Sequence, residues 1–132
     1  MNERVVVVNA GKMNYDHLLD FSVLSNDVQV YDDSTNAELI ERIQGATVVV
    51  TKEIPVGPEL LSQFPESVKL IVEAGTGYNN IDLDAARAKG ITVCNIPAYS
   101  TERVAHTAIM MLLNFASTMQ QQIGMLARGD RS

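Results

Sequence analysis

The chain has 132 residues, of which 46% are hydrophobic and 20% charged, a balance that excludes an intrinsically disordered polypeptide and describes one globular domain of ordinary size. Its formal net charge of −6 argues against a nucleic acid as partner, because phosphate binding requires a clustered basic face. The single cysteine, Cys94, allows no internal disulfide, and the sequence shows neither a cleavable leader nor an apolar stretch of membrane-spanning length. These features predict a cytoplasmic protein without a membrane partner.

Short apolar runs alternate with helical patterns over the first hundred residues. The runs predict strands buried on both faces, over residues 4–9, 28–31, 47–51, 70–74 and 91–93. The patterns between them predict helices over residues 12–24, 35–45, 58–64 and 82–89, with caps or starts at Ser34 or Thr35, Pro58 and Asp82. Because each helix serves as a right-handed crossover, the strands pair in parallel. The expected fold is α/β, a flavodoxin-like doubly wound parallel five-stranded sheet of order 2-1-3-4-5.

A single long helix is predicted beyond this sheet, over residues 101–128, because no helix breaker except Gly124 interrupts the pattern. Its apolar residues fall on two faces, and one small sheet cannot cover both. We therefore expect a homodimer formed by this helix and its copy, or a further domain that covers the second face. The predicted organisation is a domain of residues 1–98 followed by an interdomain or dimerisation helix of residues 99–132.

A glycine turn follows the fourth strand, where Gly75 and Gly77 flank Thr76. Without Cβ atoms at the glycines, the backbone can turn sharply and present the N–H groups of Thr76 and Gly77 to a carboxylate or a phosphate. A tight turn without a ligand is the alternative. A dinucleotide loop is rejected, because Asn80 stands where the third glycine of G-x-G-x-x-G is required. At the carboxyl edge of the sheet, this turn is expected to meet residues 9–12 and 51–54.

The segment AGTGYNNIDLDAARAKGITVCNIPAYSTERVAHT, residues 74–107, resembles the D-isomer-specific 2-hydroxyacid dehydrogenases, particularly the glycerate dehydrogenase and hydroxypyruvate reductase branch. The resemblance extends more weakly back through VVVTKEIP, residues 48–55, and the opening strand, so it covers the whole chain, and it is most specific between Gly75 and Leu113. It implies a flavodoxin-like substrate-binding domain that is followed, in a full-length parent, by a Rossmann domain for NAD or NADP. The parent would be a dimer that reduces a small 2-keto acid to a D-2-hydroxy acid.

The resemblance also implies roles for particular residues. The turn of Gly75, Thr76 and Gly77 would bind the substrate carboxylate, and the other expected substrate contacts are Tyr99, Lys52 and Thr51. Thr101 and Val104 would lie near the nicotinamide. The cofactor fingerprint and the catalytic arginine, glutamate and histidine of the family are expected beyond the long helix, so the 132 residues are expected to bind no cofactor and to be inactive alone.

Several other polar residues are assigned structural roles. His17 and His106 lack a paired carboxylate, no metal site is expected, and Cys94 is expected to be a buried small side chain. Glu73 would oppose an anionic substrate unless it points away from the turn, and Lys52 or Arg103 could compensate its charge. The alternative function is a stand-alone flavodoxin-like binding or interaction module without catalysis.

Overall fold

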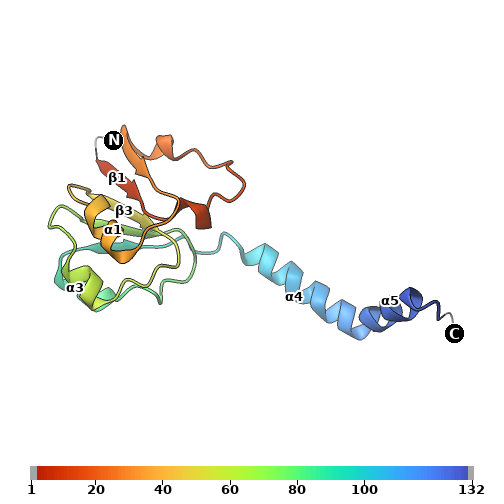
Figure 1. The fold of residues 1–132 in the computed structure, drawn as a ribbon. Helices are drawn as coiled ribbons and strands as arrows, with labels where there is room; N and C mark the ends of the chain where they lie inside the picture. The colour runs from red at the N-terminus through yellow and green to blue at the C-terminus, as the bar shows by residue number, and fades with distance from the viewer. Residues whose placement is uncertain (1–2, 131–132) are drawn as a thin grey trace. The chain divides into compact units, whose positions relative to one another are not determined.

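A five-stranded, all-parallel sheet organises the first part of the chain (Figure 1). The computed structural model describes residues 3–130, which divide into two compact units, one ending at Pro97 and one beginning at Ala98. The strands run in the order β2-β1-β3-β4-β5, and their bounds are β1 Arg4–Val7, β2 Asp27–Val30, β3 Val48–Thr51, β4 Leu70–Glu73 and β5 Thr92–Cys94. The parallel pairing and the predicted strand order are confirmed.

Three helices cross over between the strands as predicted: α1 Asn36–Arg42, α2 Pro58–Ser62 and α3 Leu83–Ala88. Thr35 caps α1 through a capping box with Glu38, in which each side chain bonds the other residue's backbone N–H. Proline opens α2, and the Asp82 carboxylate accepts from the Ala85 N–H at the start of α3. Each of these helices therefore begins at the cap or proline that the sequence predicts.

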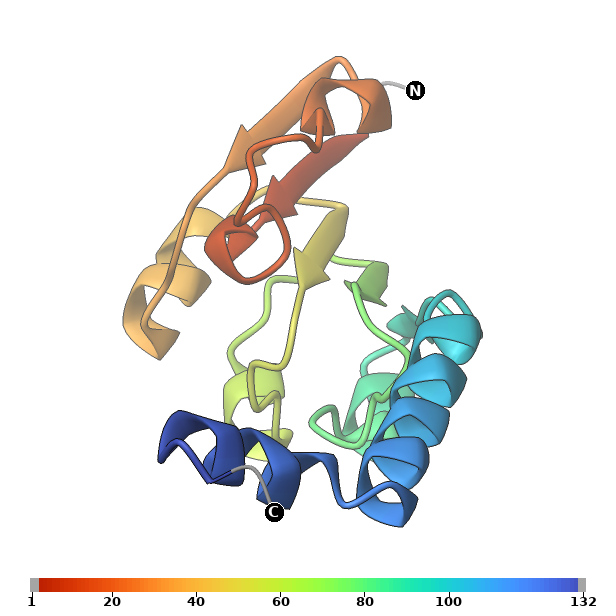
Figure 2. The same cartoon turned by 90° about the vertical axis from the view of Figure 1, so that its right-hand side faces the viewer.

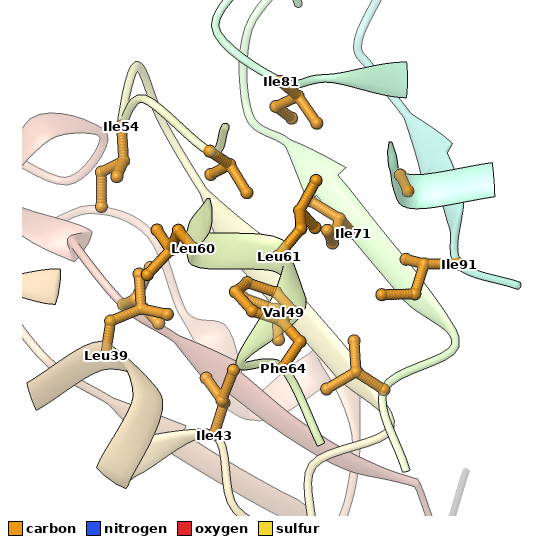
Figure 3. Packing of buried hydrophobic residues seen from close by; sticks show 14 of the residues in the cluster. Leu39, Ile43, Val49, Ile54, Leu60, Leu61, Phe64, Ile71, Ile81 and Ile91 are labelled. Carbon is orange, nitrogen blue, oxygen red and sulfur yellow. The ribbon is translucent and has the colours of Figure 1, made fainter. Parts of the chain in front are cut away.

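The main core lies between the sheet and these helices. Its members include Val49 and Ile71 of the central strands, packed against Leu39, Ile43, Leu61 and Phe64, as Figure 3 shows. Each of these six side chains is at most 3% exposed. Burying one such side chain stabilises the fold by roughly 1.5–3 kcal/mol, so this layer fixes β3 and β4 as a rigid base for the loops at their ends.

The opposite face of the sheet carries no long helix between β1 and β2, so the predicted helix over residues 12–24 is wrong. Two short 3₁₀ helices, η1 Ala10–Lys12 and η2 Phe21–Leu24, stand in its place (Figure 2). Between them the Asn14 side chain bonds both backbone groups of Leu19, and His17 has a φ of 57°. Side-chain bonds of this kind compete with the helical ladder, which explains why apolar spacing misled the prediction.

Cys94 is exposed, so the expectation of a buried side chain is wrong. Its neighbour Val93 packs against the main core. Successive strand residues point to opposite faces, so Cys94 belongs to the other face of the sheet. The buried cluster on that face is centred on β1 and β3, and Cys94 in the edge strand β5 is not part of it.

The second unit contains two helices, α4 Thr101–Ala116 and α5 Met119–Ala127, where the sequence predicts a single one. Thr118 separates them, with a left-handed φ of 54°, and the Ser117 hydroxyl donates to the Leu113 carbonyl in the last turn of α4. These residues cannot be recognised as a break from apolar spacing. Within residues 3–130, neither helix combines the length and hydropathy needed to cross a membrane.

Candidate functional site

Three loops meet at the carboxyl edge of the sheet, as its strand order predicts. Asn9 joins the loop after β1 to the loop after β3: its Nδ2 donates to the Lys52 carbonyl at 2.6 Å, and its Oδ1 accepts from the Lys52 N–H at 2.9 Å. The Ala74 N–H donates to the Thr51 carbonyl at 2.7 Å, which joins the loop after β4. Asn9 is fully buried, so this clamp belongs to the core rather than to the surface.

The glycine turn after β4 is anchored through the carbonyl groups of Ala74, Gly75 and Thr76. Lys52 Nζ donates to the Ala74 carbonyl at 3.3 Å, the Ile96 N–H donates to the Gly75 carbonyl at 2.9 Å, and Asn95 Nδ2 donates to the Thr76 carbonyl at 2.8 Å. Within residues 3–130, the backbone N–H groups of Thr76 and Gly77 have no acceptor, and both residues are exposed. The turn is thus anchored through its acceptors and leaves donors for a ligand.

Asn95 and Ile96 also belong to this site, although the sequence does not predict them there. The Thr76 hydroxyl also donates to the Ile96 carbonyl, at 3.1 Å. These two residues follow β5, which pairs with β4, so the strand order carries a signal for their position. Their side-chain types alone gave none.

Glu73 lies beneath the turn rather than facing a ligand. Its side chain is fully buried, Oε1 accepts from the Glu53 N–H at 2.9 Å, and Oε2 accepts from Asn80 Nδ2 at 3.0 Å. The predicted conflict with an anion is therefore reduced, because these donors already compensate the carboxylate.

Lys52 supplies the positive charge next to the turn. Its side chain is 18% exposed, and Nζ lies 3.8 Å from a carboxylate oxygen of the more exposed Glu53. A partly exposed ion pair of this kind contributes little to stability. Because an ammonium group has three N–H donors, Lys52 can still donate to an anion beside Gly75. Thr51, unlike Lys52, has a buried side chain, and its contact at this edge of the sheet is the hydrogen bond that its carbonyl accepts from the Ala74 N–H.

The turn does not fit the pyrophosphate of a dinucleotide. Asn80, at the position of the third glycine, uses its side chain to bond Glu73 and, at 2.8 Å, the Ile54 carbonyl. No cofactor contact is therefore assigned to this turn.

Tyr99, Thr101 and Val104 belong to the second unit, which is described on its own. All three are exposed there, as is His106, and their roles at the site stay predictions. In the part of the chain that the structure describes, no cluster of three histidine, cysteine or carboxylate side chains could hold a metal ion.

Comparison with known proteins matches the chain to one family. Residues 5–128 match the family model described as D-isomer specific 2-hydroxyacid dehydrogenase, catalytic domain. Glycerate dehydrogenase of Methylorubrum extorquens is 33% identical over 96 residues, which are 73% of this chain and 30% of the relative. Hydroxypyruvate reductase of Blautia hydrogenotrophica is 40% identical over 76 residues, 58% of this chain and 23% of the relative. The chain thus spans less than a third of these curated relatives.

Solved structures agree on the fold. A crystal structure of D-lactate dehydrogenase from Aquifex aeolicus, complexed with NAD and lactic acid, superposes with a TM-score of 0.83 at 24% identity and covers 98% of this chain and 38% of that one. NAD⁺-bound 3-phosphoglycerate dehydrogenase of Entamoeba histolytica gives a TM-score of 0.68 at 25% identity, over 86% of this chain and 39% of that one.

Proposed function

This chain belongs to the D-isomer specific 2-hydroxyacid dehydrogenase family, and we propose that it is the substrate-binding part of an NAD- or NADP-dependent oxidoreductase for small 2-hydroxy acids. The observation that carries the proposal is the pair of free N–H groups at Thr76 and Gly77, on a turn anchored through the carbonyls of Ala74, Gly75 and Thr76. Two adjacent main-chain donors match the two oxygens of one carboxylate.

In the proposed mechanism, this turn binds and orients the acid. Charge-assisted bonds from Thr76 and Gly77 hold the carboxylate, and the Lys52 ammonium offsets its charge. Because the reacting carbonyl carbon is bonded directly to the carboxylate carbon, fixing the carboxylate also limits where that carbon can lie. Tyr99 is proposed to contact the same substrate.

The cofactor supplies the reducing equivalent: a 2-keto acid, NADH or NADPH, and a proton give a D-2-hydroxy acid and the oxidised cofactor. The glycine turn is not its binding site, and Thr101 and Val104 are proposed as neighbours of the nicotinamide only. The 132 residues alone are proposed to bind the acid without reducing it.

A homodimer formed through residues 101–128 is proposed as the assembly. Helices α4 and α5 expose large apolar side chains, among them Ile109 at 56% and Leu113 at 62%. A hollow of about 570 Å³ on this unit is lined by these two residues together with His106, Met110, Asn114, Ser117 and Met119. Exposed apolar area of this kind favours burial against a second protein surface.

The proposal is tested by following the backbone amides of the ¹⁵N-labelled chain during titration with D-lactate. The Thr76 and Gly77 signals are expected to shift with saturation, whereas lactamide, which lacks the charge, shifts them little. The amides of Gly45 and Gly90, in turns after α1 and α3, serve as internal controls. Equal shifts with lactamide, or shifts confined to other residues, would contradict the proposed binding site. In a separate assay, the chain is mixed with NADH and hydroxypyruvate, and oxidation of NADH would contradict the proposal that the chain alone is inactive.

A further inference from the structure

Glu73 is a buried carboxylate that the proposed mechanism does not use. Among residues 3–130 it is the charged residue in the buried class, where the other polar members are Asn9, Ser25 and Thr51. Charged side chains are rarely fully buried unless they are paired or hydrogen-bonded, because removing them from water is costly. Its place at the end of β4, directly before the glycine turn, suggests a role in the site rather than in the core.

The carboxylate of Glu73 connects two loops. Oε1 accepts from the N–H of Glu53, a residue held at a φ of 59°, and Oε2 accepts from the side chain of Asn80. A left-handed conformation is unfavourable for a glutamate, so the bond to the Glu53 N–H compensates part of this cost. Asn80 in turn donates to the Ile54 carbonyl. One carboxylate therefore fixes both the loop after β3 and the segment at Asn80 that follows the glycine turn.

Gly75 shows how near the two charges of this network lie to the turn. A Cβ built on Gly75 would lie 3.4 Å from Glu73 Oε1 and 3.5 Å from Lys52 Nζ. In the described part of the chain no direct ion pair joins Glu73 to Lys52. The buried carboxylate thus attracts the ammonium toward the turn without consuming its hydrogen-bond donors.

We propose that Glu73 is a positioning residue: with Asn80 and the Glu53 N–H, it holds the Lys52 loop against the glycine turn, so that the ammonium and the two free N–H groups act on one carboxylate. This inference rests on the proposed function of the turn. Glu73 itself does not touch the substrate. Its effect on binding passes through Lys52.

Replacing Glu73 by glutamine tests this role, because glutamine keeps the size but offers one acceptor in place of two and no charge. The dissociation constant for D-lactate, followed at the Thr76 and Gly77 amides, is expected to rise about tenfold. Glu66→Gln removes an exposed carboxylate and Val68→Ala weakens the core away from the site, and neither is expected to change the affinity of the folded chain.

A double-mutant cycle with Lys52→Met separates positioning from a general structural effect. If Glu73 acts through Lys52, the loss of affinity caused by Glu73→Gln largely disappears once the ammonium is gone. Additive losses, or unchanged affinity in Glu73→Gln, would overturn the inference while leaving the function of the turn intact. Failure of the unmodified chain to bind D-lactate at Thr76 and Gly77 would instead refute the proposed function.

Gly75→Ala takes the place of Glu73→Gln in the cycle if that variant loses the amide dispersion of a folded chain. Its methyl group would meet Glu73 and Lys52 at ordinary contact distances, so the fold tolerates it. The methyl group separates the two charges, and the same lack of additivity with Lys52→Met is expected. Additive losses would again overturn the positioning role.

Discussion

Replacing Asn9 by alanine should loosen the carboxyl edge of the sheet. The Asn9 side chain is fully buried and bonds both the N–H and the carbonyl of Lys52, at 2.9 and 2.6 Å. Alanine removes both bonds and leaves two partly buried backbone groups without partners. An unsatisfied buried group costs about 1–3 kcal/mol, and water can reach Lys52 in part, so we expect a loss of about 2–4 kcal/mol in the free energy of unfolding.

The loss is measurable by urea unfolding. The chain has no tryptophan, so far-UV circular dichroism is the suitable signal. With a slope of about 2 kcal/mol per molar urea, the midpoint should fall by about 1–2 M. Asn36→Ala is the matched control, since Asn36 is exposed at the start of α1, and it should change stability by less than about 0.5 kcal/mol.

Asn9→Asp probes the same clamp through pH. Its carboxylate still accepts from the Lys52 N–H but turns a second oxygen toward the Lys52 carbonyl, which raises the pKa of the new group in the folded chain. The protonated form can donate to that carbonyl. The stability of the Asn9→Asp variant should therefore be closest to that of the unmodified chain below about pH 3.9, the pKa in the unfolded chain, and fall as the pH rises through the higher pKa of the folded chain.

For the Asn9→Ala variant, a urea midpoint equal to that of the unmodified chain would refute the structural role of the Asn9 hydrogen bonds.

Two further predictions concern α1 and the second unit. Hydrogen bonds from the Thr35 backbone and side chain, with a smaller contribution from Arg42, lower the pKa of Glu38 in the folded chain. The stabilising effect of Glu38 should therefore be complete above about pH 4.5 and fade as the pH falls through the pKa of the folded state. The urea midpoints of Glu38→Gln and the unmodified chain should converge in acid, and a difference that stays constant with pH would contradict this assignment. The double variant Ile109→Glu, Leu113→Glu should sediment as a monomer where the unmodified chain sediments as a dimer, because two charges in an apolar contact are strongly unfavourable. A monomeric unmodified chain would contradict the proposed assembly.

The sequence predicts those parts of the fold that local chemistry determines. The strands are short runs of apolar residues, and Thr35, Pro58 and Asp82 mark where helices begin, so the element order and the sheet topology follow. The segment between β1 and β2 does not follow, because Asn14 and Asp20 bond nearby backbone groups and favour turns over the helix that apolar spacing suggests.

The site is predictable to a similar extent. The glycine turn and its free donors follow from a strand followed by two glycines, whereas the partners that anchor it lie 19 or more residues away in sequence, as with Asn95 and Thr76. Glu73 could be recognised as a charge near the turn, but the direction of its side chain depends on Glu53 and Asn80. Long-range polar contacts of this kind leave no periodic pattern in a sequence.

A crystal structure of the chain with D-lactate would test most directly whether the turn after β4 binds a carboxylate. We expect both carboxylate oxygens about 2.7–3.2 Å from the backbone nitrogens of Thr76 and Gly77, with Lys52 Nζ close to the same group. A carboxylate bound elsewhere, or backbone N–H groups of Thr76 and Gly77 directed away from it, would contradict the account.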